Sequence, residues 1–334
     1  MNYYPVGIDP AMDIGYFTAH EQYSPRTLLA HTSRAEAAGF DTVWTSDHVH
    51  PWWHTGAHCG AAHPWLGAAL ERTDRVRIGT GVTPPIARYH PGYLAQVFAT
   101  LGDLYPGRVH LALGTGEAMN EVPLNYEWVP YPERRNRLID ACEIISRLWD
   151  GGFVDYEGHY WGVNDMNLYT LPRERVPLYI AANGPKTTEV AGRYAEGLLT
   201  LVDVDTYHER LEPALEDGAD QMGRDPDDIR RIRQLLISYH PDFDRAREST
   251  GFWRGPPAIG FDQEIADPRE IEAAGREIPM DEMTEEFFIV DDPAAIVEKL
   301  ASLKAAGFDE VELLSSSPDQ DLFIETMEHV IEEV

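Results

Sequence analysis

The chain has 334 residues, and its 57 acidic against 27 basic side chains give a formal charge of −30. Such a negative surface repels nucleic acid and anionic lipid, so we expect neither as a partner. The length permits one large barrel or two ordinary domains. The sequence has no long apolar run and no charged-then-apolar leader, which predicts a cytoplasmic protein without a membrane span.

The acidic residues are spread through otherwise well-patterned helices, which argues against disorder. We interpret the charge as an adaptation to high salt, where screening relieves self-repulsion. An ordinary acidic protein is the alternative, and equal thermal stability at low and molar salt would refute the adaptation. Cys59 and Cys142 lie far apart without metal-ligand spacing, which predicts free thiols in a reducing cytoplasm.

Strands and helices alternate along the first half of the chain. An apolar strand at 13–17 precedes a helix that Ser24 caps and Pro25 opens. This helix runs through Ala38, and Gly39 is its expected C-cap. Further strands are predicted at 42–44, 76–80 and 109–113, with helices at 91–104 and 133–149.

The second half repeats the alternation around two insertions. Aromatic residues and a Glu157-Gly158 turn predict a small hairpin at 153–170, and residues 254–286 are expected to form an irregular lid or loop. Strands are predicted at 176–182, 197–201, 232–239 and 310–314, with helices from 185, at 206–222, at 292–306 and from 319. Eight strands with intervening helices predict one α/β domain over 1–334, a (β/α)8 TIM barrel. A doubly wound open sheet is the alternative, because the number of strands does not establish closure.

The stretch Ser46–His54, directly after the strand at 42–44, combines a carboxylate, three imidazoles and two indoles. Such groups suit a site that handles protons beside a planar ring, and an aromatic-rich surface loop is the alternative. In a (β/α)8 barrel this segment lies at the carboxyl ends of the strands, where active sites are built. The nearby histidines 50, 54, 58 and 63 lack the spacing of a zinc site, so no metal is expected.

Two glycine-containing turns fall on the same predicted rim. Gly114-Thr115-Gly116 permits close backbone approach to a ligand, and Glu117 could carry a proton, although an ordinary strand-to-helix turn is the alternative. The segment lacks the third glycine of a dinucleotide fingerprint and the lysine of a phosphate loop. The turn Ala182–Thr187 is typical either of an anion-binding helix start, with Lys186 as its cation, or of a simple cap.

Together, five segments resemble the deazaflavin-dependent dehydrogenases of the bacterial-luciferase-like superfamily, which use coenzyme F420. They are Glu21-Gln22-Tyr23, Ser46-Asp47-His48 with Pro51-Trp52, Arg88-Tyr89-His90-Pro91, Gly114–Glu121 and Ala181–Pro185. The resemblance covers nearly the whole chain, with the motifs in order. It implies a luciferase-like barrel, a homodimer, and hydride transfer between an alcohol carbon and the deazaflavin ring. Combined with the charge, it leads us to expect a haloarchaeal type of protein.

The resemblance also implies residue roles. His48 and Glu117 match the catalytic acid–base pair, with His48 taking the substrate proton and Glu117 facing N1 of the coenzyme, and Trp52 matches an aromatic near the reacting carbon. Glu21 and Thr200 are the expected substrate-binding residues. Coenzyme contacts are expected from Asp47, Gly81, Val82, Thr115, Gly116, Asn120, Asn183, Gly184, Lys186 and Thr187. The family carries a non-prolyl cis peptide where Gly81-Val82 falls, and a glycine where Asn183 stands.

The substrate is expected to be a small uncharged alcohol or sugar. Sugar-phosphate dehydrogenases of the family hold the phosphate with a threonine, two lysines and an arginine. Here Thr200 keeps the threonine, but Asp203, the segment 261–264 and Glu285-Glu286 replace the cations, unless Arg254 or Arg269 compensates. Glucose 6-phosphate is therefore the alternative substrate. An FMN-dependent monooxygenase and a non-catalytic F420-binding protein are the alternative functions.

Overall fold

The computed structural model describes residues 12–260 and 264–334, in which eight parallel strands close into a barrel. The strands are β1 (Asp13–Thr18), β2 (Thr42–Thr45), β3 (Arg77–Thr80), β4 (Val109–Leu113), β7 (Leu178–Ala181), β8 (Gly197–Thr200), β9 (Arg230–Tyr239) and β11 (Glu310–Ser315). Pairing of β8 with β9, β9 with β11 and β11 with β1 completes the circle. The predicted (β/α)8 barrel is therefore confirmed, and the open-sheet alternative is wrong.

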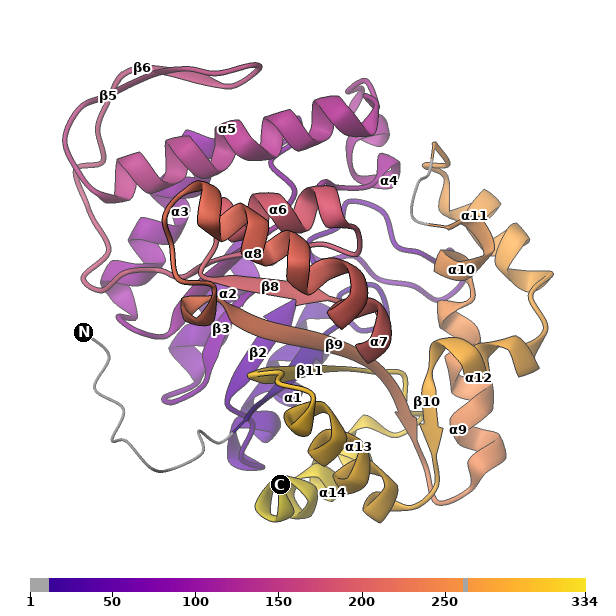
Figure 1. The fold of residues 1–334 in the computed structure, drawn as a ribbon. Helices are drawn as coiled ribbons and strands as arrows, with labels where there is room; N and C mark the ends of the chain where they lie inside the picture. Colours follow the sequence, from indigo (N-terminus) through magenta and orange to yellow (C-terminus); the bar gives the residue numbers. More distant parts are fainter. Residues whose placement is uncertain (1–11, 261–263) are drawn as a thin grey trace.

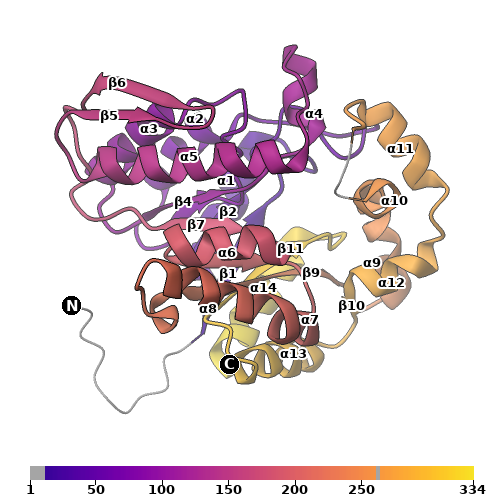
Figure 2. The same ribbon diagram turned by 45° about the horizontal axis from the view of Figure 1, so that its top comes forward.

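Helices cover the outside of the barrel (Figures 1 and 2). They are α1 (Pro25–Ala37), α2 (Ala62–Arg72), α3 (Pro91–Leu104), α5 (Tyr131–Trp149), α6 (Pro185–Tyr194), α7 (Val204–Thr206), α8 (Glu212–Gln221), α13 (Pro293–Ala305) and α14 (Gln320–Glu333). Ser24 caps α1 by accepting the Thr27 N–H at 3.2 Å, as the sequence predicts. Helix α2 was not predicted, and a π-helical turn at Tyr207–Leu211 joins α7 to α8.

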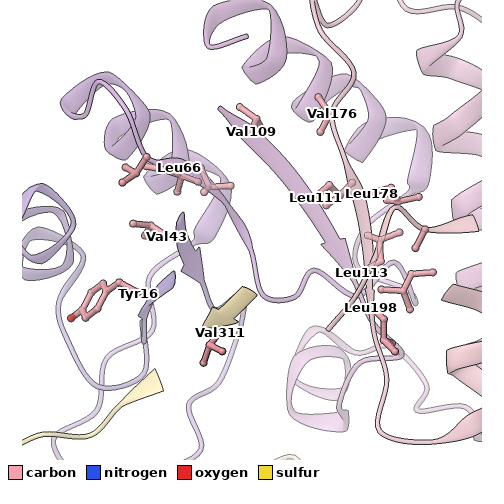
Figure 3. Close-up of a cluster of buried hydrophobic side chains, with 14 of the residues drawn as sticks. Tyr16, Val43, Leu66, Val109, Leu111, Leu113, Val176, Leu178, Leu198 and Val311 are labelled. Carbon is pink, nitrogen blue, oxygen red and sulfur yellow. The ribbon is translucent and has the colours of Figure 1, made fainter. Parts of the chain in front are cut away.

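Alternating residues of each strand divide the core into two parts. Apolar side chains on the outer face pack against the helices, and Figure 3 shows Tyr16, Val43, Leu111 and Val311 among them. The other face fills the barrel with residues such as Trp44 and Tyr179, whose rings stack 5.7 Å apart. Because side chains fill the interior of the barrel, a ligand of such a barrel binds at its mouth.

The hairpin predicted at 153–170 is present as β5 (Val154–Glu157) and β6 (Gly162–Met166). Its turn docks on the buried carboxylate of Asp140 in α5. That carboxylate accepts backbone N–H groups from His159, Tyr160 and Trp161 at 2.7–3.0 Å. One buried acidic side chain thus satisfies three turn amides and fixes the hairpin on the barrel.

The expectation of an irregular segment at 254–286 is wrong, because the described part of this segment is largely helical. After α9 (Phe243–Ser249) come α10 (Gly255–Ile259), α11 (Pro268–Arg276) and α12 (Met283–Glu286), and β10 (Phe288–Val290) then pairs with the end of β9. Asp267 caps α11 by accepting the Arg269 N–H at 2.9 Å, and Pro268 opens the helix. Residues 261–263 of the segment lie outside the described residues.

Short turns complete the backbone between these elements. They are the four-residue helix α4 (Ala118–Glu121) and single 3-10 turns at Val122–Leu124, Pro226–Asp228, Thr250–Trp253 and Met280–Glu282. Within residues 12–260 and 264–334, no helix combines the length and the apolar character that a membrane crossing requires.

Candidate active site

A cavity of about 650 Å³ opens at the carboxyl ends of the strands. Most residues of the predicted site line it, and they come from segments that follow five different strands. They are Glu21, His48, Trp52, Gly81, Val82, Thr115, Gly116, Glu117, Asn183, Gly184, Lys186 and Thr187. The mouth of one barrel therefore gathers the imidazole and the carboxylate that the sequence predicts as an acid–base pair.

His48 is held by a chain of polar contacts at the end of β2. Its Nδ1 lies 3.1 Å from Oε1 of Glu21, and Oε2 of Glu21 accepts the Ser46 hydroxyl at 2.8 Å. Ser46 in turn accepts the backbone N–H of His20 at 2.9 Å. The ring of Trp52 packs edge-on against the imidazole, with centroids 5.6 Å apart. Nδ1 lies within ion-pair distance of Glu21 without a hydrogen bond, whereas Nε2 is absent from the buried polar atoms that lack a partner. Since His48 lines the cavity, Nε2 is the nitrogen placed to receive a proton there.

Glu117 is tied to the segment that carries His48. Its Oε2 accepts the side-chain amide of Asn120 at 2.9 Å, and Oδ1 of Asn120 accepts the Val49 N–H at 2.9 Å. Asn120 therefore bridges the loops after β2 and β4. It is fully buried and is not among the residues that line the cavity, so its position favours a supporting role over direct coenzyme contact.

Asp47 also lies behind the cavity wall. Its carboxylate accepts the hydroxyls of Thr83 at 2.8 Å and Tyr89 at 3.1 Å, and the Arg88 guanidinium lies 3.4 Å away. These partners occupy Asp47, which is almost completely buried. We conclude that Asp47 fixes the start of the His48 loop, whereas the sequence had suggested a coenzyme contact.

A second buried carboxylate, Glu121, lies in the same region. Burial raises the pKa of Glu121 to about 7, and the charges of Glu117 and Asp47 act in the same direction. The Arg88 backbone N–H, which Glu121 accepts at 2.9 Å, opposes this shift. The wall behind Glu117 thus contains an acid that is partly protonated near neutral pH.

One side of the cavity is built for close backbone contact. The Gly81–Val82 peptide is cis, as the resemblance implies, and both residues line the cavity. A Cβ on Gly114 would lie 2.6 Å from Cγ2 of Val82, so any larger residue there would push the two loops apart. Gly116 has a φ of +70°, a backbone conformation that favours glycine. A flat ligand surface can therefore approach the backbone here.

The start of α6 forms the other end of the cavity. Gly184 is the N-cap residue and makes no side-chain cap hydrogen bond, and a Cβ added to it would meet nothing within 4 Å. Lys186 and Thr187 line the cavity beside it, and the Thr187 hydroxyl bonds the Tyr131 hydroxyl at 2.8 Å. Free helix amides and a cation make this end suited to an anionic group.

Thr200 does not line the cavity, contrary to the expected substrate contact. Its hydroxyl donates to Oδ1 of Asn183 at 3.1 Å, and the Leu201 N–H donates to the same oxygen at 2.9 Å. Thr200 is fully buried and holds Asn183 in place at the wall. The position of Thr200 at a strand end thus indicated the correct region of the barrel, but the side chain that reaches the cavity there is that of Asn183.

A second cavity of about 680 Å³ adjoins the first. Trp52, Asn183, Leu201, Gln234, Trp253 and Leu314 line both cavities. Three acidic residues, Asp203, Glu285 and Glu286, line the second cavity, and its basic side chain is Arg233. The Thr206 backbone N–H lowers the pKa of Asp203, and burial lowers the pKa of Arg233 to about 10. At neutral pH the second cavity is therefore net negative.

The two arginines suggested as compensating cations lie elsewhere. Arg254 donates to the carbonyls of Gly251 and Ile278, and Arg269 pairs with Asp267 beside His50. Neither residue lines the two cavities. Within the described residues, Arg233 thus stands alone against three carboxylates in the second cavity.

The sequence interpretation missed several lining residues, namely Phe17, Tyr131, Arg134, Gln234, Trp253 and Leu314. Phe17, Gln234 and Leu314 belong to strands, where a pattern of buried residues does not reveal which ones reach the mouth. In the described residues no cluster of histidine, cysteine, aspartate or glutamate has a metal-binding arrangement, and Cys59 and Cys142 are free.

Comparison with known proteins identifies the family to which this barrel belongs. The family model for luciferase-like monooxygenases matches residues 12–310. A solved structure of coenzyme F420-dependent tetrahydromethanopterin reductase from Methanopyrus kandleri superimposes with a TM-score of 0.77 at 24% identity, over 95% of this chain and 97% of that one. At this identity the similarity shows the fold alone, a luciferase-like barrel.

Nearer relatives narrow the class. F420-dependent glucose-6-phosphate dehydrogenases from Microbacterium testaceum and Beutenbergia cavernae are 46% and 42% identical, over 93% of this chain and 93% and 94% of theirs. The structure of an F420-dependent secondary alcohol dehydrogenase with an F420–acetone adduct is 38% identical, with a TM-score of 0.93 over 97% of this chain and 99% of that one. The chain belongs to the luciferase-like family of F420-dependent dehydrogenases. These curated relatives are actinobacterial, so the expectation of a haloarchaeal type is not supported.

Proposed function

We propose that this chain transfers hydride between the CH–OH carbon of an uncharged alcohol or sugar and coenzyme F420. The observation that carries the proposal is that His48 and Glu117 line one cavity at the barrel mouth. The coenzyme supplies the hydride acceptor, and the protein supplies geometry and proton access. The relatives are named as F420-dependent glucose-6-phosphate dehydrogenases and an F420-dependent secondary alcohol dehydrogenase, and both names describe oxidation at a CH–OH carbon.

The lining residues fit such a coenzyme. Gly81, Gly114 and Gly116 line one side of the cavity, and their backbone forms a wall against which a planar ring can lie. At the other end, the open position at Gly184 and the cation of Lys186 suit an anionic part of the coenzyme. We assign Thr115, Gly116 and Thr187 to the same binding surface because they line the cavity between these ends.

His48 is the proposed base for the substrate hydroxyl. Hydride leaves an alcohol carbon more readily as the O–H proton departs, so a base that works near neutral pH accelerates the reaction. Glu21 lies 3.1 Å from Nδ1 of His48, and we assign Nε2, which retains accessible surface, as the atom that takes the proton. Glu117, positioned by Asn120, is the proposed second acid–base group, facing the coenzyme.

The preference for an uncharged substrate is supported by the second cavity. A substrate reaching past Trp52 and Gln234 enters the space lined by Asp203, Glu285 and Glu286. A phosphate dianion would be repelled there, since a single guanidinium faces three carboxylates. Glucose 6-phosphate, the substrate named for two of the relatives, remains the alternative.

Two other functions are weighed against this one. An FMN-dependent monooxygenase would consume oxygen, whereas a deazaflavin dehydrogenase would not. A non-catalytic coenzyme carrier has no use for a histidine fixed by a buried glutamate in the cavity wall. We also propose that the protein works as a cytoplasmic homodimer, which sedimentation of the purified chain would test.

An absorbance assay of oxidised F420 tests the proposed function. The purified protein is mixed with F420 and with secondary alcohols, neutral sugars or sugar phosphates in turn. We expect loss of oxidised coenzyme with an alcohol or a neutral sugar. Efficient oxidation of glucose 6-phosphate in preference to neutral substrates would overturn the substrate assignment. Coenzyme binding without reduction by any substrate would support the carrier.

A further inference from the structure

Gln234 occupies the place where the two cavities meet. It lies on β9, lines both cavities, and is mostly buried. Of the other five residues shared by the cavities, four are large apolar or aromatic side chains, Trp52, Leu201, Trp253 and Leu314. The fifth, Asn183, already uses its side-chain oxygen to hold Thr200 and Leu201. Gln234 and Asn183 are thus the two polar side chains at a largely apolar junction, and the side-chain oxygen of Asn183 is already engaged.

A buried acid holds Gln234 in one orientation. Glu312 lies opposite Gln234 in the pairing of β9 with β11, and its Oε1 accepts Nε2 of Gln234 at 2.8 Å. Glu312 is fully buried, and within the described residues its Oε2 has no hydrogen-bond partner. An ionised carboxylate in this position would be strongly unfavourable. Burial accordingly raises the pKa of Glu312 well above its usual range, although Arg233 opposes the shift.

This arrangement leaves one atom of Gln234 for a ligand. Its Nε2 is engaged below the cavity by Glu312, and its Oε1 accepts no hydrogen bond from the described part of the chain. Oε1 is also absent from the buried atoms that lack a partner, so it retains accessible surface. Since Gln234 lines both cavities, Oε1 is a fixed acceptor at their junction. The group that such an acceptor recognises is a hydroxyl donor.

We infer that Gln234, positioned by Glu312, hydrogen-bonds a second hydroxyl group of the substrate and thereby selects polyhydroxy substrates over simple monohydric alcohols. The inference rests on the proposed function and names a specificity-determining residue for it. The reacting hydroxyl is near His48, and the second hydroxyl is directed toward the junction. A substrate without that hydroxyl leaves a buried acceptor unpaired, which discriminates against it.

The test compares kcat/KM for 2-propanol with kcat/KM for a set of polyols, glycerol and glucose among them. We expect wild-type protein to prefer at least one polyol over 2-propanol by about tenfold or more. In Gln234→Met, which has similar length but no acceptor oxygen, we expect kcat/KM for that polyol to fall about tenfold. The rate with 2-propanol and the coenzyme affinity, measured by fluorescence, should stay within about twofold. Gln234→Ala serves as a second variant if the first is unstable.

Variants of Glu312 test whether this residue positions Gln234. Glu312→Gln keeps a carbonyl acceptor for Nε2 and should retain the polyol preference, whereas Glu312→Leu should lose it. Combining Glu312→Leu with Gln234→Met should cause no further loss. An equal fall for polyols and 2-propanol in Gln234→Met, or no fall for either, would overturn the inference and leave the proposed function standing. Failure of the wild type to reduce F420 with any alcohol would overturn both.

Discussion

Nδ1 of His48 lies 3.1 Å from Oε1 of Glu21, and Glu21 is almost completely buried. Glu21 follows β1 and His48 follows β2, so this pair joins two adjacent strand ends of the barrel. A buried carboxylate in this position limits how the imidazole can turn, because the ring lies against Glu21 on one side and Trp52 on another. The remaining ring nitrogen is then available as a base toward the cavity.

Replacing Glu21 should impair proton transfer without emptying the coenzyme site. We expect Glu21→Gln to lower kcat by roughly tenfold to a hundredfold, since general acid–base catalysis by a positioned group contributes about 10²–10⁴. Steady-state kinetics measure the loss of kcat, and a coenzyme titration checks that F420 still binds. An unchanged kcat would show that Glu21 does not orient the base.

Gly184 should be required for the coenzyme but not for the fold. A Cβ there meets nothing within 4 Å in the described part of the protein, so Gly184→Ala should leave the melting temperature within about 2 °C of wild type. The added methyl group projects where we place an anionic part of the coenzyme, and overpacking of this kind should weaken F420 binding about fivefold or more. The matched control is Gly67→Ala in α2, where a Cβ also meets nothing. Equal coenzyme affinity in the two variants would contradict the assigned site.

Glu121 should make stability depend on pH in a defined direction. Because burial raises its pKa from 4.5 to about 7, the folded protein keeps a proton that the unfolded chain has lost between these values. The free energy of unfolding contributed by Glu121 is therefore highest below about pH 4.5 and decreases as the pH rises toward 7. Glu121→Gln removes this titration. Relative to wild type, the variant should gain up to about 3 kcal/mol between pH 4 and pH 8, measured by denaturant unfolding. A constant difference across pH would contradict this assignment.

The second cavity should determine whether the enzyme prefers a charged or an uncharged substrate. Replacing an acid with a cation there, as in Glu285→Lys, should raise kcat/KM for glucose 6-phosphate about tenfold while changing that for a neutral alcohol by less than about twofold. Glu325→Lys on the exposed face of α14 makes the same change of net charge at a distance and is the control. A similar rise in both variants would indicate a general effect of the acidic surface rather than a local one.

Much of the fold was predictable because its local signals are strong. Ser24-Pro25 starts α1 as expected, and short apolar runs separated by helices specify the barrel strands. The helix α11 was predictable too, since Asp267-Pro268 is the same kind of start signal, but polar residues around it hid the pattern. What periodicity does not encode is closure, which depends on pairing of β8 with β9.

The candidate site was predictable to the level of segments but not of atoms. His48, Glu117 and Lys186 line the cavity as expected. Asp47 instead lies behind the cavity wall. The direction in which a loop side chain points depends on tertiary hydrogen bonds, such as the one that Asp47 accepts from Thr83, and the sequence does not reveal them. Gln234 was missed because a single glutamine within a buried strand gives no signal until β11 places Glu312 opposite it. The proposed salt adaptation likewise depends on solution behaviour and stays a prediction.

The account depends on one histidine more than on any other residue, and a neighbouring histidine offers a control. His54 is exposed and is not among the residues that line the main cavity, whereas His48 lines it. Both residues lie on the loop after β2, so replacing either with alanine removes a similar side chain from the same segment. A difference in activity between the two variants therefore reflects where the histidine lies and not merely the loss of a histidine from this loop.

The decisive measurement is the rate of F420 reduction by the best alcohol substrate in wild type, His48→Ala and His54→Ala, with coenzyme affinity determined in parallel. We predict that His48→Ala lowers kcat by about 10²–10⁴-fold, while its affinity for F420 stays within a few-fold of wild type. His54→Ala should keep both. Turnover by His48→Ala at close to the wild-type rate would contradict the assignment of the imidazole at the barrel mouth as the base.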